Sequence, residues 1–467
     1  MKNLLLALGY SLCVINTGYA TPLPADEQMI GSRAVQTVIW AMPAVNYDRM
    51  LQAMFKAGGK ENQVVYWSKL FDWQNQTLTP NPNTIYLMPF MNTKDTGPLV
   101  VEIPAASEGQ EITGTIIDAW QVALEDVGPA GADKGAGGKY LVLPPGYAGD
   151  IPNGYIVLRP STNMSMALFR SSIGEASAAD IARAVAYGKR IRVYPLSKAS
   201  DPPATTFVDA MGTTFDSTIP YDIRFFEALD RFVQREPWLE RDKAMIDQMK
   251  SIGIEQGKPF QPDAERKRVL EQAAVSASSW LDKQYQALFS PYYPGGQWAL
   301  PVAHELTEGL ANNFSTPGVY PVDSRGVLFS FAFSSVKKLG TGQFYLVALR
   351  DGTGVPFDGA STYRLRVPAN APVRLYWSAT VYDRSTHTLI QNQRWPSRGS
   401  MTPGLQSNAD GSVDLYVGPQ PPAGKEANWI PTQAGRGWEI MMRFYGPQPP
   451  LFDKSWVLPD LEKTPAQ

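Results

Sequence analysis

The segment His304-Glu305-Leu306-Thr307-Glu308 has the residue types of a metal site. If Pro301 opens a helix, His304 and Glu308 lie one turn apart on the same face and could bind one metal ion. Glu305 would stand beside them as a base, as in zinc peptidases, although Glu308 replaces the usual second histidine. The alternative is an amphipathic helix with exposed acids and a surface or capping histidine.

A second candidate site lies at the end of an apolar strand, where Tyr382, Asp383 and Arg384 follow one another. Rigid β structure would aim such side chains into a site. Together with His304 and Glu305 they are the candidate catalytic residues. The alternative is a strand end with a turn-forming aspartate and a solvated arginine. The position of His387, close by in the sequence, favours the site.

Polar and aromatic side chains suggest a ligand site. Asn81, Asn83, Thr84 and Tyr86 could form a polar cluster at the entrance of a strand, or could simply satisfy the backbone of a turn. The aromatic side chains could line a pocket for a sugar or an apolar ligand, or could belong to the core. The candidate ligand-binding residues are Trp40, Tyr47, Asn81, Asn83, Tyr86, Trp120, Trp377 and Trp429.

Several common catalytic signatures are missing from the sequence. No G-x-S-x-G nucleophile elbow is present, and Gly131 to Lys139 fails the spacing of a phosphate loop. No dinucleotide-binding fingerprint is found either. A Ser-His-Asp triad stays open, since its members need not be adjacent in sequence.

Helices and strands alternate in blocks along the chain. Residues 26 to about 60 have helical spacing, with an interruption at Pro43 and a second stretch from Tyr47 through Phe55. Short β-prone runs dominate from Val64 to Pro195, and three helices are expected between Tyr221 and Phe289. From Gly326 strands return, beginning with Leu328 to Phe333.

This order predicts an α+β multidomain protein with two antiparallel β-sandwich or jelly-roll-like domains and a helical segment between them. We expect a signal peptide over 1–20, an N-terminal mostly β domain with leading helices over 21–220, a helical region over 221–312, and a C-terminal β-sandwich over 313–467.

The first twenty residues have the three parts of a secretory signal: Lys2, a short apolar run, and small residues at Gly18 and Ala20. Cleavage after Ala20 would remove Cys13, the single cysteine, so the exported chain would form no disulfide. We therefore expect a soluble periplasmic or secreted protein. With only two histidines and no further cysteine, no cofactor is expected, and a divalent metal at His304 and Glu308 is the alternative.

The charge balance limits the partners. The chain has 42 basic and 44 acidic side chains, which gives a net charge of −2 and no basic surface for nucleic acid. No segment after the signal is long and apolar enough to span a membrane stably. We expect a small-molecule or sugar ligand as the partner, and a homo-oligomer stays open.

Two sets of motifs resemble bacterial proteins that join two domains of unknown function, 1254 first and 1214 last. The first set comprises Ala44–Tyr47, Thr79–Tyr86 and Gly97–Pro104, and the second Tyr376–Asp383, Asp410–Tyr416, Asn428–Pro431 and Arg443–Pro447. The resemblance implies β-sandwich domains with a helical part and implies no established reaction. Relatives often have aspartate at the position of Asn83, so a charge-dependent role there does not carry over.

Two functions are compatible with these residues. One is a hydrolase that acts on a small or amphipathic substrate in a cleft between the domains. The other is a non-catalytic periplasmic ligand-binding or cell-envelope protein with an aromatic pocket. Convergent titratable groups in a cleft would favour the enzyme.

Overall fold

The structure is a computed structural model that describes residues 24–465, apart from 108, 175, 288, 334–335 and 339–341. The expected signal peptide, including Cys13, lies outside the described residues. In the part of the chain that the structure describes, no helix has the length and apolar character needed to cross a membrane.

The N-terminal half contains two sheets. The larger has the order β11-β1-β3-β9-β5-β6 and the smaller the order β10-β4-β7-β8, and all neighbours are antiparallel except β1 with β11 and β7 with β8. A shared apolar core lies between the sheets, with Val64, Ile85 and Val101 among its members. The strands are β1 (Gln63–Tyr66), β3 (Ile85–Asn92), β4 (Leu99–Ile103), β5 (Ile112–Asp118), β6 (Ala123–Val127), β7 (Gly138–Val142), β8 (Ile156–Leu158), β9 (Met164–Ser171), β10 (Arg192–Pro195) and β11 (Phe207–Asp209).

The C-terminal part is a sandwich of two four-stranded sheets, ordered β13-β19-β15-β16 and β18-β17-β14-β20. Leu346, Ile440 and Leu415 share the apolar core of these sheets. The strands are β13 (Gln343–Ala348), β14 (Tyr363–Val367), β15 (Val373–Asp383), β16 (Ser397–Gly399), β17 (Val413–Gly418), β18 (Trp429–Pro431), β19 (Trp438–Pro447) and β20 (Glu462–Lys463). A small two-stranded sheet of β2 (Asn75–Gln76) and β12 (Phe215–Asp216) stands apart.

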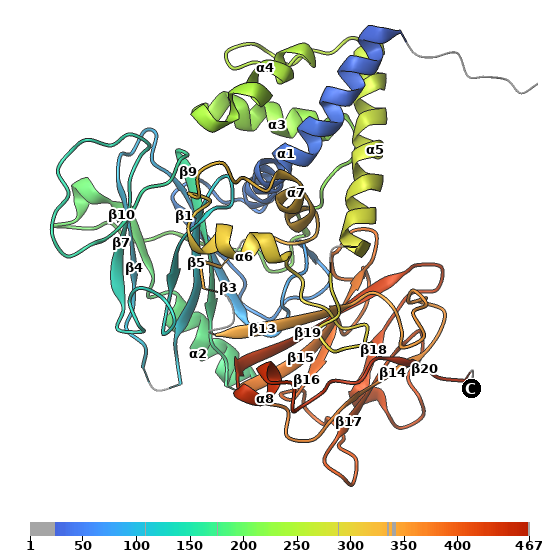
Figure 1. The fold of residues 1–467 in the computed structure, drawn as a ribbon. Coiled ribbons are helices and arrows are strands. Elements are labelled where there is room, and N and C mark those ends of the chain that lie inside the picture. The colour runs from blue at the N-terminus through green and yellow to red at the C-terminus, as the bar shows by residue number, and fades with distance from the viewer. Residues whose placement is uncertain are drawn as a thin grey trace, which may run out of the picture.

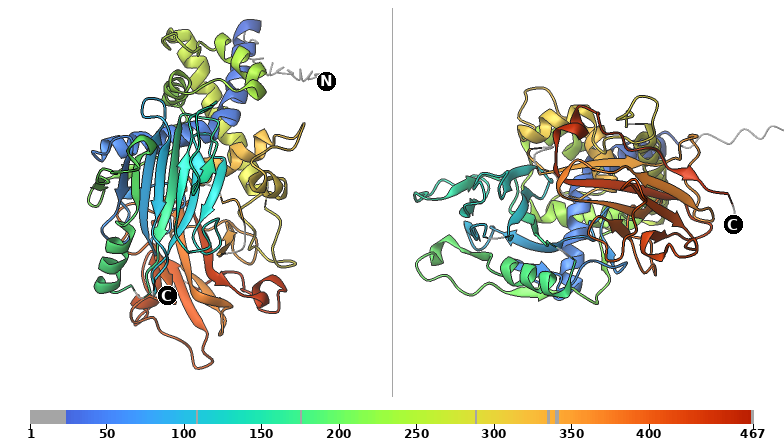
Figure 2. Two further views of the ribbon diagram at one scale, coloured as in Figure 1. Left: turned by 90° about the vertical axis from the view of Figure 1, so that its left-hand side faces the viewer. Right: turned by 90° about the horizontal axis from the view of Figure 1, so that it is seen from below.

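Helices join the two β regions (Figures 1 and 2). The long α1 packs against α3, α5 and α7, and α2 lies on the larger N-terminal sheet. The predicted helices between Tyr221 and Phe289 are confirmed as α3, α4 and α5. The helices are α1 (Ala25–Lys56), α2 (Ala178–Gly188), α3 (Ile223–Arg235), α4 (Lys243–Ser251), α5 (Ala264–Ala287), α6 (His304–Ala311), α7 (Val322–Phe331) and α8 (Pro449–Phe452), with short 3-10 turns at Leu196–Lys198, Glu240–Asp242 and Glu426–Asn428.

The interruption predicted at Pro43 is wrong, because α1 runs through it without a break. Proline cannot donate to the carbonyl of Ile39, one turn earlier, which usually kinks or ends a helix. Here tertiary contacts hold the segment. The carbonyl of Pro43 accepts a hydrogen bond of 2.9 Å from Gln121, and Gly326 of α7 lies against the Ile39 carbonyl.

The strand predicted over Leu328 to Phe333 is also wrong, because Val322–Phe331 forms α7. A short apolar run fits a buried strand and a buried helix equally well. Residues Ser324 to Phe331 are all buried, and Asn46 of α1 donates hydrogen bonds to the carbonyls of Phe329 (2.7 Å) and Ala332 (2.8 Å) at the end of α7. Packing between helices therefore decides the conformation of this segment.

Candidate functional site

A cavity of about 720 Å³ lies between α5 and the C-terminal sandwich. Its walls come from α5, from the turn that follows β15, and from the start of β19. Apolar side chains such as Leu78 and Phe357 alternate in the lining with the charged Asp282, Arg384 and His387. The cavity is large enough for a small organic molecule.

The turn after β15 presents His387 to the cavity. The backbone N–H of Asp383 donates to Thr388 (2.9 Å), and that of His387 donates to Asp383 (2.8 Å), which closes the turn. His387 has a φ of 56°, in the left-handed region that a residue with a side chain seldom adopts. Such a conformation persists only where the surroundings hold it. Here they direct the imidazole toward β19.

Glu439 holds the imidazole in place. Nδ1 of His387 lies 2.9 Å from Oε1 of Glu439, and the hydroxyl of Tyr285 in α5 donates to Oε2 over 2.9 Å. The carboxylate is 1% exposed, and Nε of Arg384 is 3.9 Å away. Burial raises the pKa of Tyr285 well above its usual value, and the nearby Glu439 raises it further, so the phenol remains a donor.

This geometry fits a general base. A carboxylate only accepts hydrogen bonds, so Nδ1 of His387 carries a proton, and in the neutral tautomer that this bond selects Nε2 keeps its lone pair. The side chain of His387 is 12% exposed, and its ring lies against the ring edges of Tyr285 (4.9 Å) and Phe331 (6.1 Å). A histidine oriented by a buried carboxylate is the arrangement that activates a hydroxyl or a water.

Three arginines line the cavity wall, and two of them are paired with aspartates that line it as well. Arg384 pairs with Asp282 and stacks over Tyr285 at 4.7 Å, while Arg436 pairs with Asp383. Burial raises the pKa of Asp383, but hydrogen bonds from Arg436 and Ser385 outweigh it and leave that pKa below its usual value. Arg350 binds Gln286 (3.0 Å) and the Gly354 carbonyl (3.3 Å).

The predicted catalytic residues lie in three different places. Asp383 and Arg384 line the cavity together with His387. Tyr382 points to the opposite face of β15, as alternation along a strand requires, and donates to the Pro80 carbonyl (2.7 Å). His304 begins α6, and Glu305 of the same helix is not among the residues that line the cavity.

No serine triad forms at His387 within the described residues, since no hydroxyl is hydrogen-bonded to its ring. Ser330 and Ser385 line the cavity, but their hydroxyls donate elsewhere, to the Val327 carbonyl (2.7 Å) and to Asp383 (2.6 Å). His387 therefore lines the cavity with no hydroxyl nucleophile bonded to its ring.

The predicted metal residues lie where the sequence indicated, on one helix. His304 begins α6 and Glu308 follows one turn later. Glu305 accepts a hydrogen bond from Ser324, and Glu308 accepts one from Thr316 over 3.4 Å. Among the residues that the structure describes, no three His, Cys, Asp or Glu side chains gather as a metal site.

The aromatic ligand candidates are spread over the molecule, and none lines the cavity. Trp40 and Trp120 pack together at 4.9 Å beside a void of about 10 Å³, too small for a ligand. Tyr47 donates to the Ser165 carbonyl (3.1 Å). Trp377 belongs to the core of the C-terminal sandwich, and the indole of Trp429 donates to Gly418 (2.8 Å).

The remaining ligand candidates gather at the junction of the two β regions. Asn81 donates to the hydroxyl of Tyr445 over 2.5 Å, and Asn83 donates to that of Ser397 over 2.9 Å. Tyr86 lies nearby, with Arg170 above its ring at 5.2 Å. The segment Thr79–Tyr86 thus contacts β16 and β19, so motifs far apart in the sequence meet in space.

Glu439 and Tyr285 are site residues that were not predicted from the sequence, and His387 was expected only to support the site. Glu439 interrupts the apolar run Trp438–Met442, and a charged residue inside a buried strand was the available signal. Tyr285 carries no such signal, because its spacing on α5 is that of an ordinary core residue.

The chain matches two family descriptions. Residues 61–195 match "Protein of unknown function (DUF1254)" and residues 342–449 match "Protein of unknown function (DUF1214)". No curated protein matches the chain.

Two solved structures are similar along almost the whole chain. The VPA0106 protein from Vibrio parahaemolyticus is 17% identical with a TM-score of 0.56, covering 93% of this chain and all of its own. An uncharacterised protein from Burkholderia cenocepacia is 12% identical with a TM-score of 0.39, covering 94% of each chain. The first likeness supports the fold alone. With both domains matched in the predicted order, the chain belongs to the family of proteins that combine DUF1254 with DUF1214.

Proposed function

We propose that the protein is a hydrolase that acts on a small or amphipathic ester in the cavity between α5 and the C-terminal sandwich. The observation that carries this proposal is the 2.9 Å contact between Nδ1 of His387 and the buried Glu439, with the ring facing a cavity of about 720 Å³. A buried carboxylate that orients a cavity histidine is typical of acid–base catalysis.

In this mechanism a water molecule is the nucleophile. Nε2 of His387 takes a proton from the water as its oxygen attacks the ester carbonyl, and Glu439 stabilises the imidazolium that forms. The imidazolium then returns the proton to the leaving alkoxide, which yields an acid and an alcohol. Arg350 or Arg384 would supply positive charge for the negative oxygen of the tetrahedral intermediate.

Hydrolysis of p-nitrophenyl acetate, butyrate and octanoate tests the proposal. We expect His387→Asn to lower kcat/KM by about 100-fold or more, the usual contribution of a general base. Glu240→Gln is the control, because Glu240 is exposed and lies outside the cavity lining. Equal rates for His387→Asn and the unmodified protein would refute the hydrolase.

Binding without catalysis is the second candidate function. The apolar lining by Leu78, Ile219 and Leu349 favours it. In that case an apolar fluorescent probe such as anilinonaphthalene sulfonate should bind, Leu349→Asp should prevent it, and His387→Asn should change no turnover. A probe that binds equally well to Leu349→Asp would exclude this cavity as the binding site.

We further propose that the protein acts after export, with cleavage between Ala20 and Thr21. The support is the sequence Gly18-Tyr19-Ala20 behind an apolar run. N-terminal sequencing of the protein from the periplasmic fraction should find Thr21 first, and a chain there that still begins at Met1 would contradict the proposal.

A further inference from the structure

The junction between the two β regions contains two guanidinium groups and three tyrosines, which we call the arginine–tyrosine cluster: Arg170, Arg443, Tyr86, Tyr345 and Tyr445. Arg170 and Tyr86 come from the paired strands β9 and β3. Tyr345 comes from β13, and Arg443 and Tyr445 from its partner β19. Both DUF domains therefore contribute to the cluster.

Arg443 is 2% exposed. Its terminal nitrogens donate to the Thr380 hydroxyl (3.1 Å) and to the Thr79 carbonyl (2.9 Å), and its Nε is buried without a partner. The guanidinium also lies over the rings of Tyr345 (5.1 Å) and Tyr382 (5.7 Å). These contacts position the group but leave its charge without an anion.

Arg170 likewise has no anion beside its guanidinium group. Its Nε donates to the hydroxyl of Tyr86 over 3.3 Å, and the guanidinium lies over the Tyr86 ring at 5.2 Å. In the described part of the chain, no carboxylate comes within 4.0 Å of Arg170 or of Arg443. Burial alone would lower the pKa of Arg443, but the surrounding tyrosines, Tyr382 first, raise it more, so the guanidinium is charged.

Among the tyrosines of the cluster, the Tyr86 hydroxyl is available as a donor. The Tyr445 hydroxyl accepts from Asn81 over 2.5 Å, so its own proton is directed toward the hydroxyls of Tyr376, which is its hydrogen-bond partner, and of Tyr345, 3.5 Å away. The Tyr86 hydroxyl accepts from Arg170, and its proton has no acceptor among the described residues. Burial raises the pKa of Tyr445 well above its usual value, which keeps this phenol protonated.

Two positive charges, the unpartnered Nε of Arg443 and the unused phenol proton of Tyr86 at one place need an acceptor. A buried charge is costly unless it is paired and hydrogen-bonded. Planar guanidinium groups match the geometry of carboxylate and phosphate oxygens, and charge-assisted hydrogen bonds to them are strong. Arg170 and Tyr345 are only partly buried, so the cluster is open to solvent on that side.

We propose that the arginine–tyrosine cluster is a binding site for an oxyanion, the carboxylate or phosphate group of a small molecule. The site does not depend on the hydrolase proposal, because none of its five residues lines the cavity at His387. An anion bound there would contact both DUF domains at once. It would therefore stabilise their junction as well as fill the site.

Thermal unfolding of the full chain with sodium phosphate or sodium acetate, against sodium chloride at equal ionic strength, tests the proposal. A ligand that binds the folded state raises Tm as its concentration rises. Arg170→Gln and Tyr86→Phe should weaken the binding of the effective anion by about tenfold or more, since each removes a charge-assisted or phenolic donor. Isothermal titration gives the Kd for each variant.

The matched control is Arg190→Gln, because Arg190 lies over the ring of Tyr187 at 5.3 Å, away from the cluster. It should keep the full response. A response to phosphate alone or to acetate alone identifies the group, and either supports the site. No response to either anion, or an equal response in Arg170→Gln and the unmodified protein, would overturn the proposal. Neither variant changes Arg443, whose loss could impair folding.

Discussion

Tyr285 of α5 donates a hydrogen bond of 2.9 Å to Oε2 of Glu439 in β19, and the other oxygen of that carboxylate contacts His387. The bond joins the helical region to the C-terminal sandwich beside the cavity, which Tyr285 lines. Tyr285 thus satisfies a buried carboxylate and also fixes the group that orients the imidazole. It is a positioning residue for His387.

Tyr285→Phe should lower the free energy of unfolding by about 1–3 kcal/mol, because it leaves a buried acceptor without its donor. It should also lower kcat of ester hydrolysis more than it changes KM, since the imidazole loses its orientation. Urea unfolding and steady-state kinetics measure the two effects. Tyr147→Phe, at a hydroxyl with only a long 3.4 Å contact to Asp150, is the control and should change neither. Unchanged stability in Tyr285→Phe would contradict the hydrogen bond.

Gly326 offers a test of the contact between α1 and α7. Glycine inside a helix usually costs about 1 kcal/mol relative to alanine. A Cβ at Gly326, however, would lie 2.7 Å from the Ile39 carbonyl oxygen and 2.9 Å from Ile39 Cγ2. We expect Gly326→Ala to destabilise the protein by about 1–3 kcal/mol through overpacking.

Gly31→Ala is the matched control for this substitution. Gly31 lies in α1, and a Cβ there would meet its nearest atom, Val269 Cγ1, at 3.7 Å. It should stabilise the protein by about 0.5–1 kcal/mol. Urea unfolding of the two variants should therefore give changes of opposite sign. Stabilisation by both alanines would show that α1 and α7 do not approach so closely.

The sequence predicted local structure well where it depends on neighbours in the chain. Short β-prone runs between Val64 and Pro195 do form strands, and the three helices expected between Tyr221 and Phe289 are present. It failed at Pro43 and at Leu328, because contacts between α1 and α7 outweigh local preference there. A pattern of residues contains no record of such contacts.

Only part of the candidate site could be predicted from the sequence, because local patterns do not reveal contacts between distant segments. Asp383 and Arg384 carry a local signal, a charged pair at a strand end, and they do line the cavity. Tyr285, His387 and Glu439 come from three separate segments, and only the fold brings them together. The cluster of Arg170 with Arg443 likewise requires the junction of two domains, which no single segment reveals.

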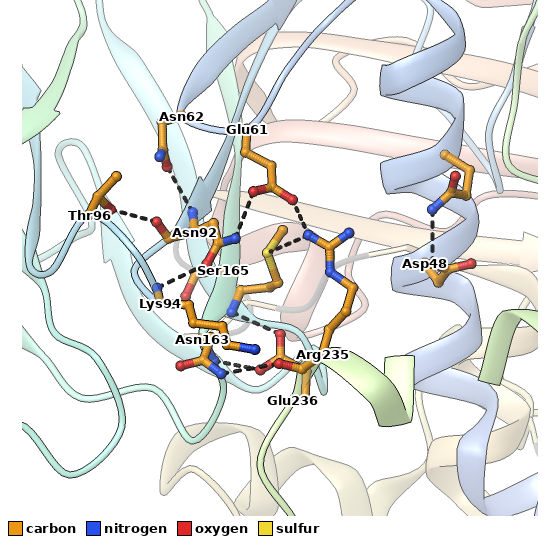
Figure 3. A network of polar contacts seen from close by, with 12 residues as sticks. Asp48, Glu61, Asn62, Asn92, Lys94, Thr96, Asn163, Ser165, Arg235 and Glu236 are labelled. Atoms are coloured by element: carbon orange, nitrogen blue, oxygen red, sulfur yellow. Dashed lines mark hydrogen bonds and ion pairs between the residues drawn. The ribbon is translucent and has the colours of Figure 1, made fainter. Parts of the chain in front are cut away.

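Glu236 lies in a polar network at the end of α3 (Figure 3). Its two carboxylate oxygens accept backbone hydrogen bonds from Met164 (2.9 Å) and Asn163 (2.6 Å), and the side chain is 3% exposed. Burial raises its pKa from 4.5 to about 7, against the lowering effect of those two hydrogen bonds. The charged form is therefore disfavoured in the folded state.

The stability of the protein should depend on pH through this group. A carboxyl whose pKa is raised on folding binds its proton more tightly in the folded state, so its contribution is fully present below pH 4.5 and is lost as pH rises to about 7. The loss amounts to about 3 kcal/mol, at about 1.4 kcal/mol per pKa unit.

Glu236→Gln tests this dependence, because glutamine does not titrate. The amide nitrogen of the glutamine would face one of the two backbone N–H donors, which lowers the free energy of unfolding by an amount that does not change with pH. In urea unfolding between pH 4.5 and 8, the free energy of unfolding of the variant should therefore rise relative to that of the unmodified protein by about 3 kcal/mol as pH rises. Glu240→Gln, at an exposed carboxylate, should leave the pH dependence as it was. Parallel curves for Glu236→Gln and the unmodified protein would mean that Glu236 is ionised in the folded state throughout this range.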